Sequence, residues 1–260
     1  MPHRAKNTSL KGLKGLVVGI ANAHSIAWGC AEAFKAAGAE LAITYLNEKA
    51  KPHVRPLADA VDAALTLPMD VENDAEVEAV FAAVEKQWGK LDFLLHSIAF
   101  APLQDLHGRV VDSSRDGFNR AMDISCHSLI RLSRLAAPLM KDGGAIMTMS
   151  YEGANRVAPH YGIMGMAKAA LEAATRALSA ELGSANISVN AISPGPIATR
   201  AASGILEFDQ LMEDSVKNAP LHRMVTIDEV GALATLLASP AGRGITGDVI
   251  VIDAGRHIML

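Results

Sequence analysis

The chain has 260 residues, of which 50% are hydrophobic and 20% are charged. A chain of this length and balance can bury a large core, and it suits one α/β domain better than two half-size ones. The net charge of −4 offers no positive surface for nucleic acid or for an anionic membrane, so we predict neither partner.

The two cysteines, Cys30 and Cys126, show neither a CxxC spacing nor a neighbouring histidine cluster. This pattern argues against a disulfide framework, and we predict no metal ligand. We interpret both as small buried hydrophobic residues in a reducing compartment. A basic segment, residues 3–14, precedes the first apolar run, but Gly19 interrupts that run too early for a signal peptide. We therefore expect a cytoplasmic protein.

Short apolar runs alternate with longer helical patterns along the chain. Most runs are continuously apolar, which is typical of strands buried on both faces of a parallel sheet. The predicted strands are residues 16–20, 40–45, 64–69, 91–97, 145–150, 187–192 and 248–253. The predicted helices are residues 25–37, 73–88, 115–140, 161–182 and 227–238, and Thr226 with Glu229 resembles a capping box before the last. This order predicts one domain over residues 1–260, a doubly wound parallel sheet of about seven strands flanked by helices.

Residues 198–221 depart from this alternation. They follow Pro194-Gly195-Pro196, show weak helical character and exceed the length of a simple connection. Insertions of this size in α/β domains are often lids or binding loops, so we predict a substrate-binding loop here. A surface excursion without a role is the alternative.

The first predicted strand ends at Gly19, and a helix is predicted from Ser25. Backbone N–H groups there would approach a pyrophosphate at the helix N-terminus. The spacing is not GxGxxG, however, and a glycine that ends a strand is more often a plain turn. Asp70 and Val71, after the third strand, suit an adenine ring, with a carboxylate for its amine and an apolar wall. A helix N-cap is an equal alternative for Asp70.

Residues 45–49, Tyr-Leu-Asn-Glu-Lys, follow the second strand. No acidic residue lies directly at the strand end to bind a ribose 2′-hydroxyl, and no arginine cluster is present for a 2′-phosphate. The indication of cofactor is therefore weak, and we predict NADH with NADPH as the alternative.

Tyr161 and Lys168 are seven residues apart in a predicted helix, so two turns would bring both side chains to one face. A lysine ammonium near a phenol favours the phenolate, which would lower the pKa of Tyr161 and suit it to proton transfer. The same lysine can hold a ribose hydroxyl. This spacing also occurs by chance in many helices, so the pair alone does not define a function.

The context of the pair is more specific. Tyr161 and Lys168 come after the fifth strand, with Asn-Ala-Ile-Ser-Pro-Gly-Pro at residues 190–196 downstream. In this the chain resembles the short-chain dehydrogenase/reductase superfamily, whose fold is a single-domain Rossmann type. Further segments make it similar to the NADH-dependent bacterial enoyl-acyl carrier protein reductases over nearly its whole length. These are Ser25-Ile26-Ala27, His96-Ser97-Ile98, Ser150-Tyr151, Gly195-Pro196-Ile197 and Ala201-Ala202-Ser203-Gly204-Ile205.

One position separates the subfamilies. Ordinary members of the superfamily place a catalytic serine thirteen residues before the tyrosine, where this chain has Thr148. Tyr151 lies ten residues before Tyr161 instead, which is the two-tyrosine arrangement of the enoyl reductases. The resemblance implies reduction of a trans-2-enoyl thioester on acyl carrier protein by NAD(P)H in fatty-acid biosynthesis. A reductase of ketones or alcohols, such as 3-oxoacyl substrates, is one alternative, and a dinucleotide-binding regulator without turnover is another.

The resemblance also implies residue roles. Tyr161 would donate a hydrogen bond to the developing enolate oxygen, Lys168 would position the nicotinamide ribose, and Tyr151 would line the acyl pocket unless it is only a packing aromatic. The predicted catalytic residues are thus Tyr151, Tyr161 and Lys168. The predicted cofactor contacts are Gly19, Ser25, Ile26, Leu46, Asp70, Val71, Ser97, Ile98, Lys168, Ile197 and Thr199. The predicted substrate contacts are Ala101, Tyr151, Tyr161, Met164, Ala201 and Ile205.

Two features bear on substrate and assembly. Ala99 stands where the resembled family usually has a glycine beside the nicotinamide, and Glu152 stands where it usually has an aliphatic residue. These two departures leave open a substrate other than the family's usual one. The helix after Tyr161 carries small residues almost all round, which allows close contact on several faces. These are Ala167, Ala169, Ala170, Ala173, Ala174, Ala177 and Ala180. Related enzymes pair such helices, so the resemblance implies a homotetramer.

Overall fold

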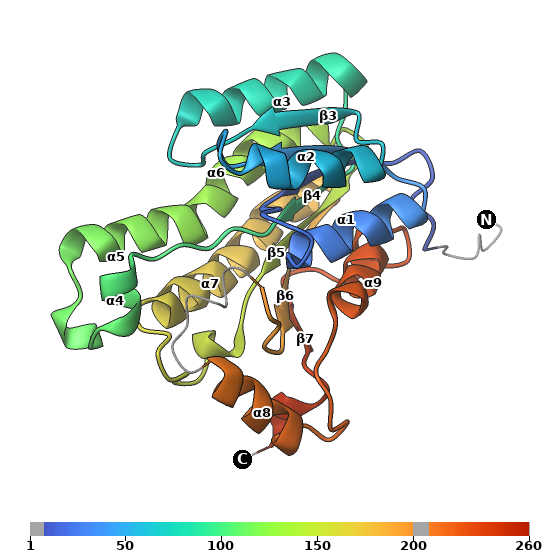
Figure 1. The fold of residues 1–260 in the computed structure, drawn as a ribbon. Helices are drawn as coiled ribbons and strands as arrows, with labels where there is room; N and C mark the ends of the chain where they lie inside the picture. The colour runs from blue at the N-terminus through green and yellow to red at the C-terminus, as the bar shows by residue number, and fades with distance from the viewer. Residues whose placement is uncertain (1–7, 200–207, 260) are drawn as a thin grey trace.

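The computed structural model describes residues 8–199 and 208–259. A sheet of seven strands runs through the molecule, with helices on both of its faces (Figure 1). The strand order is β3-β2-β1-β4-β5-β6-β7, and each neighbouring pair is parallel. The order reverses between β1 and β4, which confirms the predicted doubly wound, Rossmann-type α/β fold. Such a reversal opens a crevice for ligands outside the carboxyl ends of these two strands.

The predicted strands all overlap observed ones, because strands buried on both faces leave a continuous apolar signature in the sequence. The strands are β1 (Lys14–Val18), β2 (Glu40–Tyr45), β3 (Leu65–Pro68), β4 (Phe93–His96), β5 (Gly144–Met149), β6 (Ile187–Pro194) and β7 (Val249–Ile252). The helices of eight or more residues are α1 (Ile26–Ala36), α2 (Lys51–Ala60), α3 (Asp74–Trp88), α5 (Arg115–Met122), α6 (Ser128–Ala136), α7 (Met164–Leu182), α8 (Phe208–Asn218) and α9 (Ile227–Ala238). The predicted capping box of Thr226 and Glu229 is present at the start of α9.

Alternate residues of each strand feed two separate cores. On one face of the sheet, Val17, Leu41 and Phe93 pack with the buried sides of α1, α2 and α9. On the other face, Leu16 and Leu94 pack with α3, α6 and α7. Successive side chains of a strand point to opposite faces, so one apolar run supplies both cores. The carboxyl ends of the central strands are therefore held from two sides.

The predicted helix over residues 115–140 is interrupted. It consists of α5, a π-helical turn at Asp123–His127, and α6. Such turns are rare and are frequent at functional sites. Here Ser125 of the turn and Ser128, the first residue of α6, are buried. The Ser128 hydroxyl bonds His96 at the end of β4, and the Ser125 hydroxyl bonds the backbone of Phe100 just beyond it.

The helix predicted to begin at Tyr161 begins instead at Met164. The residues on either side of Tyr161, namely His160 and Gly162, both have positive φ angles, of 57° and 45°. Left-handed backbone cannot continue a right-handed helix, so Tyr161 lies in the turn that precedes α7. The prediction that two helical turns separate Tyr161 from Lys168 is therefore wrong.

Two helices were missed by the sequence analysis. In α2, prolines stand at positions 52 and 56, and proline within a helix is normally a breaker. The short helix α4 (Leu103–His107) has only five residues, too few for a periodic pattern.

Within the predicted 198–221 insertion, the structure describes residues 198–199 and 208–221, and α8 occupies residues 208–218. None of the described helices is long and apolar enough to cross a membrane.

Helices α1 and α9 cross at two glycines. A Cβ atom added to Gly29 would lie 2.6 Å from the backbone oxygen of Ile227, and one added to Gly231 would lie 2.5 Å from the oxygen of Gly29. Real Cβ contacts are longer than this, so both helices depend on glycine to approach so closely.

We predict that Gly29→Ala lowers the free energy of unfolding by about 2 kcal/mol, because the added methyl group meets rigid backbone. Gly183→Ala is the matched control: a Cβ there has no neighbour within 4 Å, and stability should be unchanged or slightly higher. Urea unfolding followed by circular dichroism measures both. Equal midpoints for the two variants would contradict the proposed helix contact.

Candidate active site

The crevice at β1 is built around Gly19. This residue has a φ angle of 108°, and a Cβ atom there would collide with the carbonyl group of Ser97 after β4. Glycine is therefore required, and the two predicted cofactor residues lie against each other. The Ser25 hydroxyl accepts hydrogen bonds from the N–H groups of Ala21 and Asn22, at 3.0 and 3.1 Å. Since this hydroxyl faces back into the turn, it does not cap α1, whose N-terminus suits an anionic phosphate.

The turn between β3 and α3 carries Asp70 and Val71, which were predicted to contact an adenine ring. The Asp70 carboxylate accepts a hydrogen bond from the Glu72 N–H at 3.0 Å, and Val71 is buried. The N-cap of α3 is Asn73, so the alternative of Asp70 as the cap is wrong. Leu46, at the end of β2, is 52% exposed and free to contact a bound molecule.

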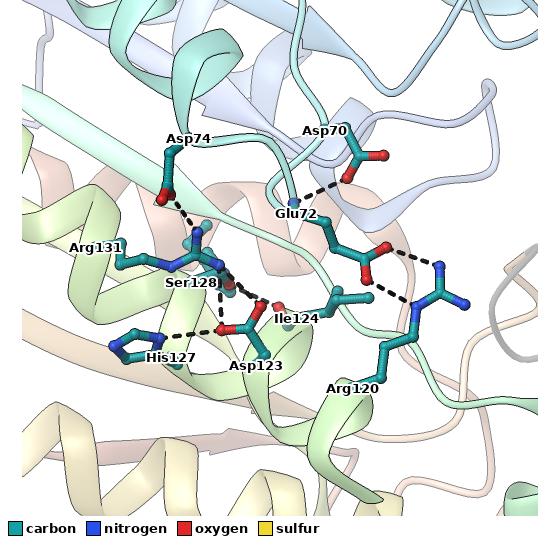
Figure 2. Close-up of polar contacts among 10 residues, drawn as sticks. Asp70, Glu72, Asp74, Arg120, Asp123, Ile124, His127, Ser128 and Arg131 are labelled. Atoms are coloured by element: carbon teal, nitrogen blue, oxygen red, sulfur yellow. Dashed lines mark hydrogen bonds and ion pairs between the residues drawn. The ribbon is translucent and has the colours of Figure 1, made fainter. Parts of the chain in front are cut away.

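Charged pairs join this turn and the start of α3 to α5 and α6, as Figure 2 shows. Arg120 of α5 donates two hydrogen bonds to Glu72, at 2.8 and 2.7 Å. Arg131 of α6 bonds Asp74 at 2.7 Å and Asp123 at 3.2 Å. A two-pronged arginine–carboxylate pair fixes geometry more firmly than a single contact. Sequence analysis missed these pairs, since their members lie 48 and 57 residues apart along the chain.

The Arg120 guanidinium also lies over the ring of Phe100, with 4.6 Å to the ring centre. The backbone of Phe100 is fixed in turn by Ser125 of the π-helical turn, which accepts from the Phe100 N–H at 2.9 Å and donates to its carbonyl at 3.1 Å. The segment that carries Ala99 and Ala101 is thereby tied to the adenine-side turn through Arg120.

The three predicted catalytic residues gather at the carboxyl end of β5. Tyr151 follows this strand, and its ring meets that of Tyr161 edge to face, with centroids 5.0 Å apart. Lys168 of α7 is 5% exposed and donates a hydrogen bond from Nζ to the carbonyl oxygen of Met149 at 2.6 Å. Tyr161 also packs with Met164 and Ala101, so three predicted substrate contacts form one apolar cluster.

Burial governs the ionisation of this group of residues. It lowers the pKa of Lys168 to about 8, against the opposing effects of Cys126 and Glu172. It raises the pKa of Tyr161, and Tyr151 raises it further. Burial likewise raises the pKa of Tyr151, with Glu152 adding to the rise and Arg256 opposing it.

The expectation that Lys168 lowers the pKa of Tyr161 is therefore wrong in this structure. The ammonium group points to the Met149 carbonyl, and desolvation of the phenol dominates. Tyr161 consequently keeps its proton at neutral pH, which is the state needed to donate a hydrogen bond.

Thr148, at the position of the usual catalytic serine, is engaged elsewhere. Its hydroxyl lies 2.9 Å from Nδ1 of His96 on the adjacent strand, and Nε2 of His96 lies 2.8 Å from the hydroxyl of Ser128. Ser128 donates its hydrogen to the carbonyl of Ile124 at 2.6 Å, so we assign the ring proton of His96 to Nε2. Burial, and secondarily Lys168, lowers the pKa of His96 to about 3, so the ring is neutral.

A buried carboxylate that sequence analysis missed lies one helical turn after Lys168. Glu172 is 5% exposed and accepts hydrogen bonds from the Ser150 hydroxyl at 2.5 Å and from the Asn155 amide at 3.2 Å. The four-residue spacing to Lys168 was visible in the sequence, but nothing there indicated burial. Among the described residues, no cluster of three or more His, Cys, Asp or Glu side chains could hold a metal ion.

The remaining predicted contacts follow β4 and β6. Ile98 and Ile197 are partly buried against the two cores, and Thr199 donates its N–H to the carbonyl of Ile197 at 2.7 Å. Ala201 and Ile205 lie outside the described residues. Glu152 lines a cavity of about 210 Å³ beside residues 193–196, together with Arg256.

A doubly wound sheet with a glycine turn after β1, together with two packed tyrosines and a buried lysine at the end of β5, defines an oxidoreductase of the short-chain dehydrogenase/reductase class. The finer assignment comes from comparison with known proteins. A family model described as Enoyl-(Acyl carrier protein) reductase matches residues 19–257, and the chain belongs to this family.

Individual relatives match over nearly the whole chain. Enoyl-acyl-carrier-protein reductase (NADH) 2 of Rhizobium meliloti is 47% identical over 252 residues, which cover 97% of this chain and 94% of the relative. The corresponding NADH enzyme of Bacillus subtilis is 44% identical over 254 residues, with 97% and 98% covered. The crystal structure of the Anaplasma phagocytophilum reductase in complex with NAD superposes with a TM-score of 0.93, at 45% identity, over 98% of this chain and 97% of that one. The Bacillus cereus reductase with NADP+ and indole naphthyridinone gives 0.94, at 44% identity, over 96% and 98%.

We predict that Lys168 makes folding stability rise with pH. The unfolded lysine keeps its proton up to a pKa near 10.5 and the folded one only to about 8, so the unfolded chain binds more protons between these values. Relative to Lys168→Met, the free energy of unfolding should rise by up to about 3 kcal/mol from pH 7.5 to 10.5. Urea titrations at several pH values measure it, and parallel curves for the two proteins would contradict the burial of a charged amine.

Proposed function

We propose that this chain is an NADH-dependent enoyl-acyl carrier protein reductase, which reduces the trans-2 double bond of an enoyl thioester in fatty-acid biosynthesis. The observation that carries the proposal is the pair of packed tyrosines beside a buried lysine, in a chain that matches the family along its length. The relatives named above are NADH enzymes of this activity.

The chemistry divides among three side chains. NADH supplies the hydride that is added to C3 of the substrate. Tyr161, kept protonated by burial, donates a hydrogen bond to the thioester oxygen as negative charge develops there. In a site with little water such a donor is far stronger than in solution. Lys168 carries positive charge below about pH 8 and holds the nicotinamide ribose, and Tyr151 lines the acyl pocket.

The dinucleotide would occupy the crevice outside β1 and β4. The Gly19 turn and the start of α1 at Ser25 and Ile26 would hold its pyrophosphate, and the structure leaves no room for a side chain at residue 19. Leu46, Asp70 and Val71 would hold its adenine. Its nicotinamide end would be held by Ser97, Ile98, Ile197 and Thr199.

The preference for NADH rests on the relatives, which are NADH enzymes. The charges after β2 decide little: Lys51 is paired with Glu48 at 3.1 Å, and Lys49 is a second cation in this turn. NADPH is therefore the alternative cofactor, since no acidic residue directly follows β2 to repel its 2′-phosphate.

The acyl chain contacts Tyr151, Tyr161, Met164 and Ala101, three of which already form one apolar cluster. The insertion at residues 198–221, with Ala201 and Ile205, forms the rest of the substrate pocket in a chain that is one catalytic domain. Reduction of a 3-oxoacyl thioester is disfavoured, since Thr148 is bonded to His96 rather than free to act as the usual serine.

The decisive experiment offers the purified protein a trans-2-enoyl thioester and, in parallel, a 3-oxoacyl thioester, with NADH and then NADPH. We expect oxidation of NADH with the enoyl substrate only, followed at the absorbance of the reduced cofactor. Turnover of the 3-oxo substrate instead would reassign the chain to the carbonyl reductases. No cofactor oxidation with either substrate would overturn the proposed function.

We expect Tyr161→Phe to lower turnover about a hundredfold or more, since it removes one hydrogen bond to a developing oxyanion. NADH affinity, measured by quenching of intrinsic fluorescence, should stay unchanged. Tyr45→Phe is the control, because this hydroxyl contacts Glu48 at 3.4 Å and Lys51, away from the reacting groups, and its activity should match that of the wild type. Undiminished turnover in Tyr161→Phe would remove Tyr161 from the reaction.

We further propose a cytoplasmic homotetramer in which α7 pairs with a second copy. In support, one side of α7 exposes small residues at Ala169, Ala173, Ala177 and Ala180, which permits close approach of another helix. Both cysteines are buried and unpaired, as suits a reducing compartment. Light scattering coupled to size exclusion should give four times the 27.3 kDa chain mass, and Ala173→Arg should reduce the assembly. An unchanged mass for that variant would place the interface elsewhere.

A further inference from the structure

We propose that Glu172 is a positioning residue for the reduction: it holds the segment that carries Tyr151 at both of its ends and supports the positive charge of Lys168. This inference rests on the proposed function, since it assigns Glu172 to the same site. It concerns a residue that contacts neither the substrate nor the cofactor directly.

Hydrogen bonds engage both side-chain oxygens of Glu172. Each of its two oxygens accepts a hydrogen bond, one from the Ser150 hydroxyl at 2.5 Å and one from the Asn155 amide at 3.2 Å. A carboxylate that is 5% exposed is costly to bury unless its oxygens are satisfied and a positive group lies near. Lys168, one turn earlier on α7, is that group.

The two donors bracket Tyr151. Ser150 is the residue before it, and Asn155 follows the short 3-10 helix at Glu152–Ala154. The Tyr151 hydroxyl itself is buried and has no hydrogen-bond partner among the described residues. Its direction is thus set by the backbone of residues 150–155 and by the edge-to-face contact with Tyr161. Glu172 fastens that backbone to the helix that carries Lys168.

The charge of Lys168 depends on what surrounds it. Burial lowers its pKa, and Cys126 of the π-helical turn and Glu172 of α7 itself oppose that shift. From β4 comes His96, which is neutral, and β6 carries no charged residue. Tyr151 and Tyr161 keep their protons, because burial raises the pKa of each phenol.

The other charges near α7 are engaged elsewhere. Arg120 of α5 and Arg131 of α6 are paired with Glu72 and Asp74. Glu152 lines the cavity beside residues 193–196 and acts on Tyr151. Of the carboxylates named here, Glu172 is the one that favours the protonated form of Lys168.

The test compares Glu172→Gln, which keeps the size and removes the charge, with Ser150→Ala, which keeps the charge and removes the shorter hydrogen bond. In the wild type, kcat/KM for a trans-2-enoyl thioester should fall above pH 8. In Glu172→Gln that fall should move to lower pH by about one unit, and kcat at pH 6.5 should drop about tenfold. Ser150→Ala should lower kcat with the inflection unmoved. Glu181→Gln, an exposed carboxylate in the last turn of α7, is the matched control and should behave as the wild type.

A pH profile and kcat for Glu172→Gln that coincide with those of the wild type would overturn the inference. If Glu172→Gln does not fold, Glu172→Asp serves instead: the charge stays, the reach to Ser150 and Asn155 is lost, and kcat should fall with the inflection near 8. A wild type without enoyl reduction would overturn the proposed function alone. Titration of the Lys168 Cε carbon by NMR, assigned with Lys168→Met, would then still decide whether Glu172→Gln lowers the pKa of that lysine.

Discussion

The burial of one ammonium group determines how the rest of this site is built. Lys168 is removed from water at the end of β5, and the carbonyl oxygen of Met149, 2.6 Å from its nitrogen, accepts a hydrogen bond from it. The polar side chains on either side of Met149 are also hydrogen-bonded. Thr148 bonds a neutral histidine, and Ser150 bonds a buried carboxylate. A strand end held in this way leaves the next residue, Tyr151, in one place.

The turn after β3 and the segment after β4 lie at two ends of the site, and the charged side chain of Arg120 connects them. The turn that carries Asp70 is bonded to α5 by Arg120, which also lies over Phe100 on the substrate side. A dinucleotide that orders the adenine-side turn would therefore also steady the segment from Ala99 to Ala101. This linkage adds to the apolar packing of Ile98 and Ala101, which also holds the segment after β4 beside the reacting groups.

Sequence reasoning reached the fold because its evidence is local: a strand buried on both faces is a continuous apolar run, and seven such runs were visible. It failed where geometry depends on distant contacts. Tyr161 was placed in a helix, although left-handed residues at positions 160 and 162 exclude it. The pKa of Tyr161 was expected to fall because a spacing of seven residues does not reveal that the ammonium points to Met149. The ion pairs of Arg120 and Arg131, and the burial of Glu172, likewise have no signature in a single sequence.

The π-helical turn at Asp123–His127 has a consequence for how this chain can vary in length. Each residue of an α-helix advances it by about 100°, so the extra residue in this turn sets α5 and α6 in different rotational phase. Deleting one residue here would restore a continuous helix and leave α6 in its core, but it would swing α5 about a quarter of a turn. Arg120 would then leave Glu72, and Ser125 would leave the backbone of Phe100. A single-codon deletion at this point would thus disconnect the turn after β3 from the segment after β4, and it would also displace Ile124 and Cys126 from the core.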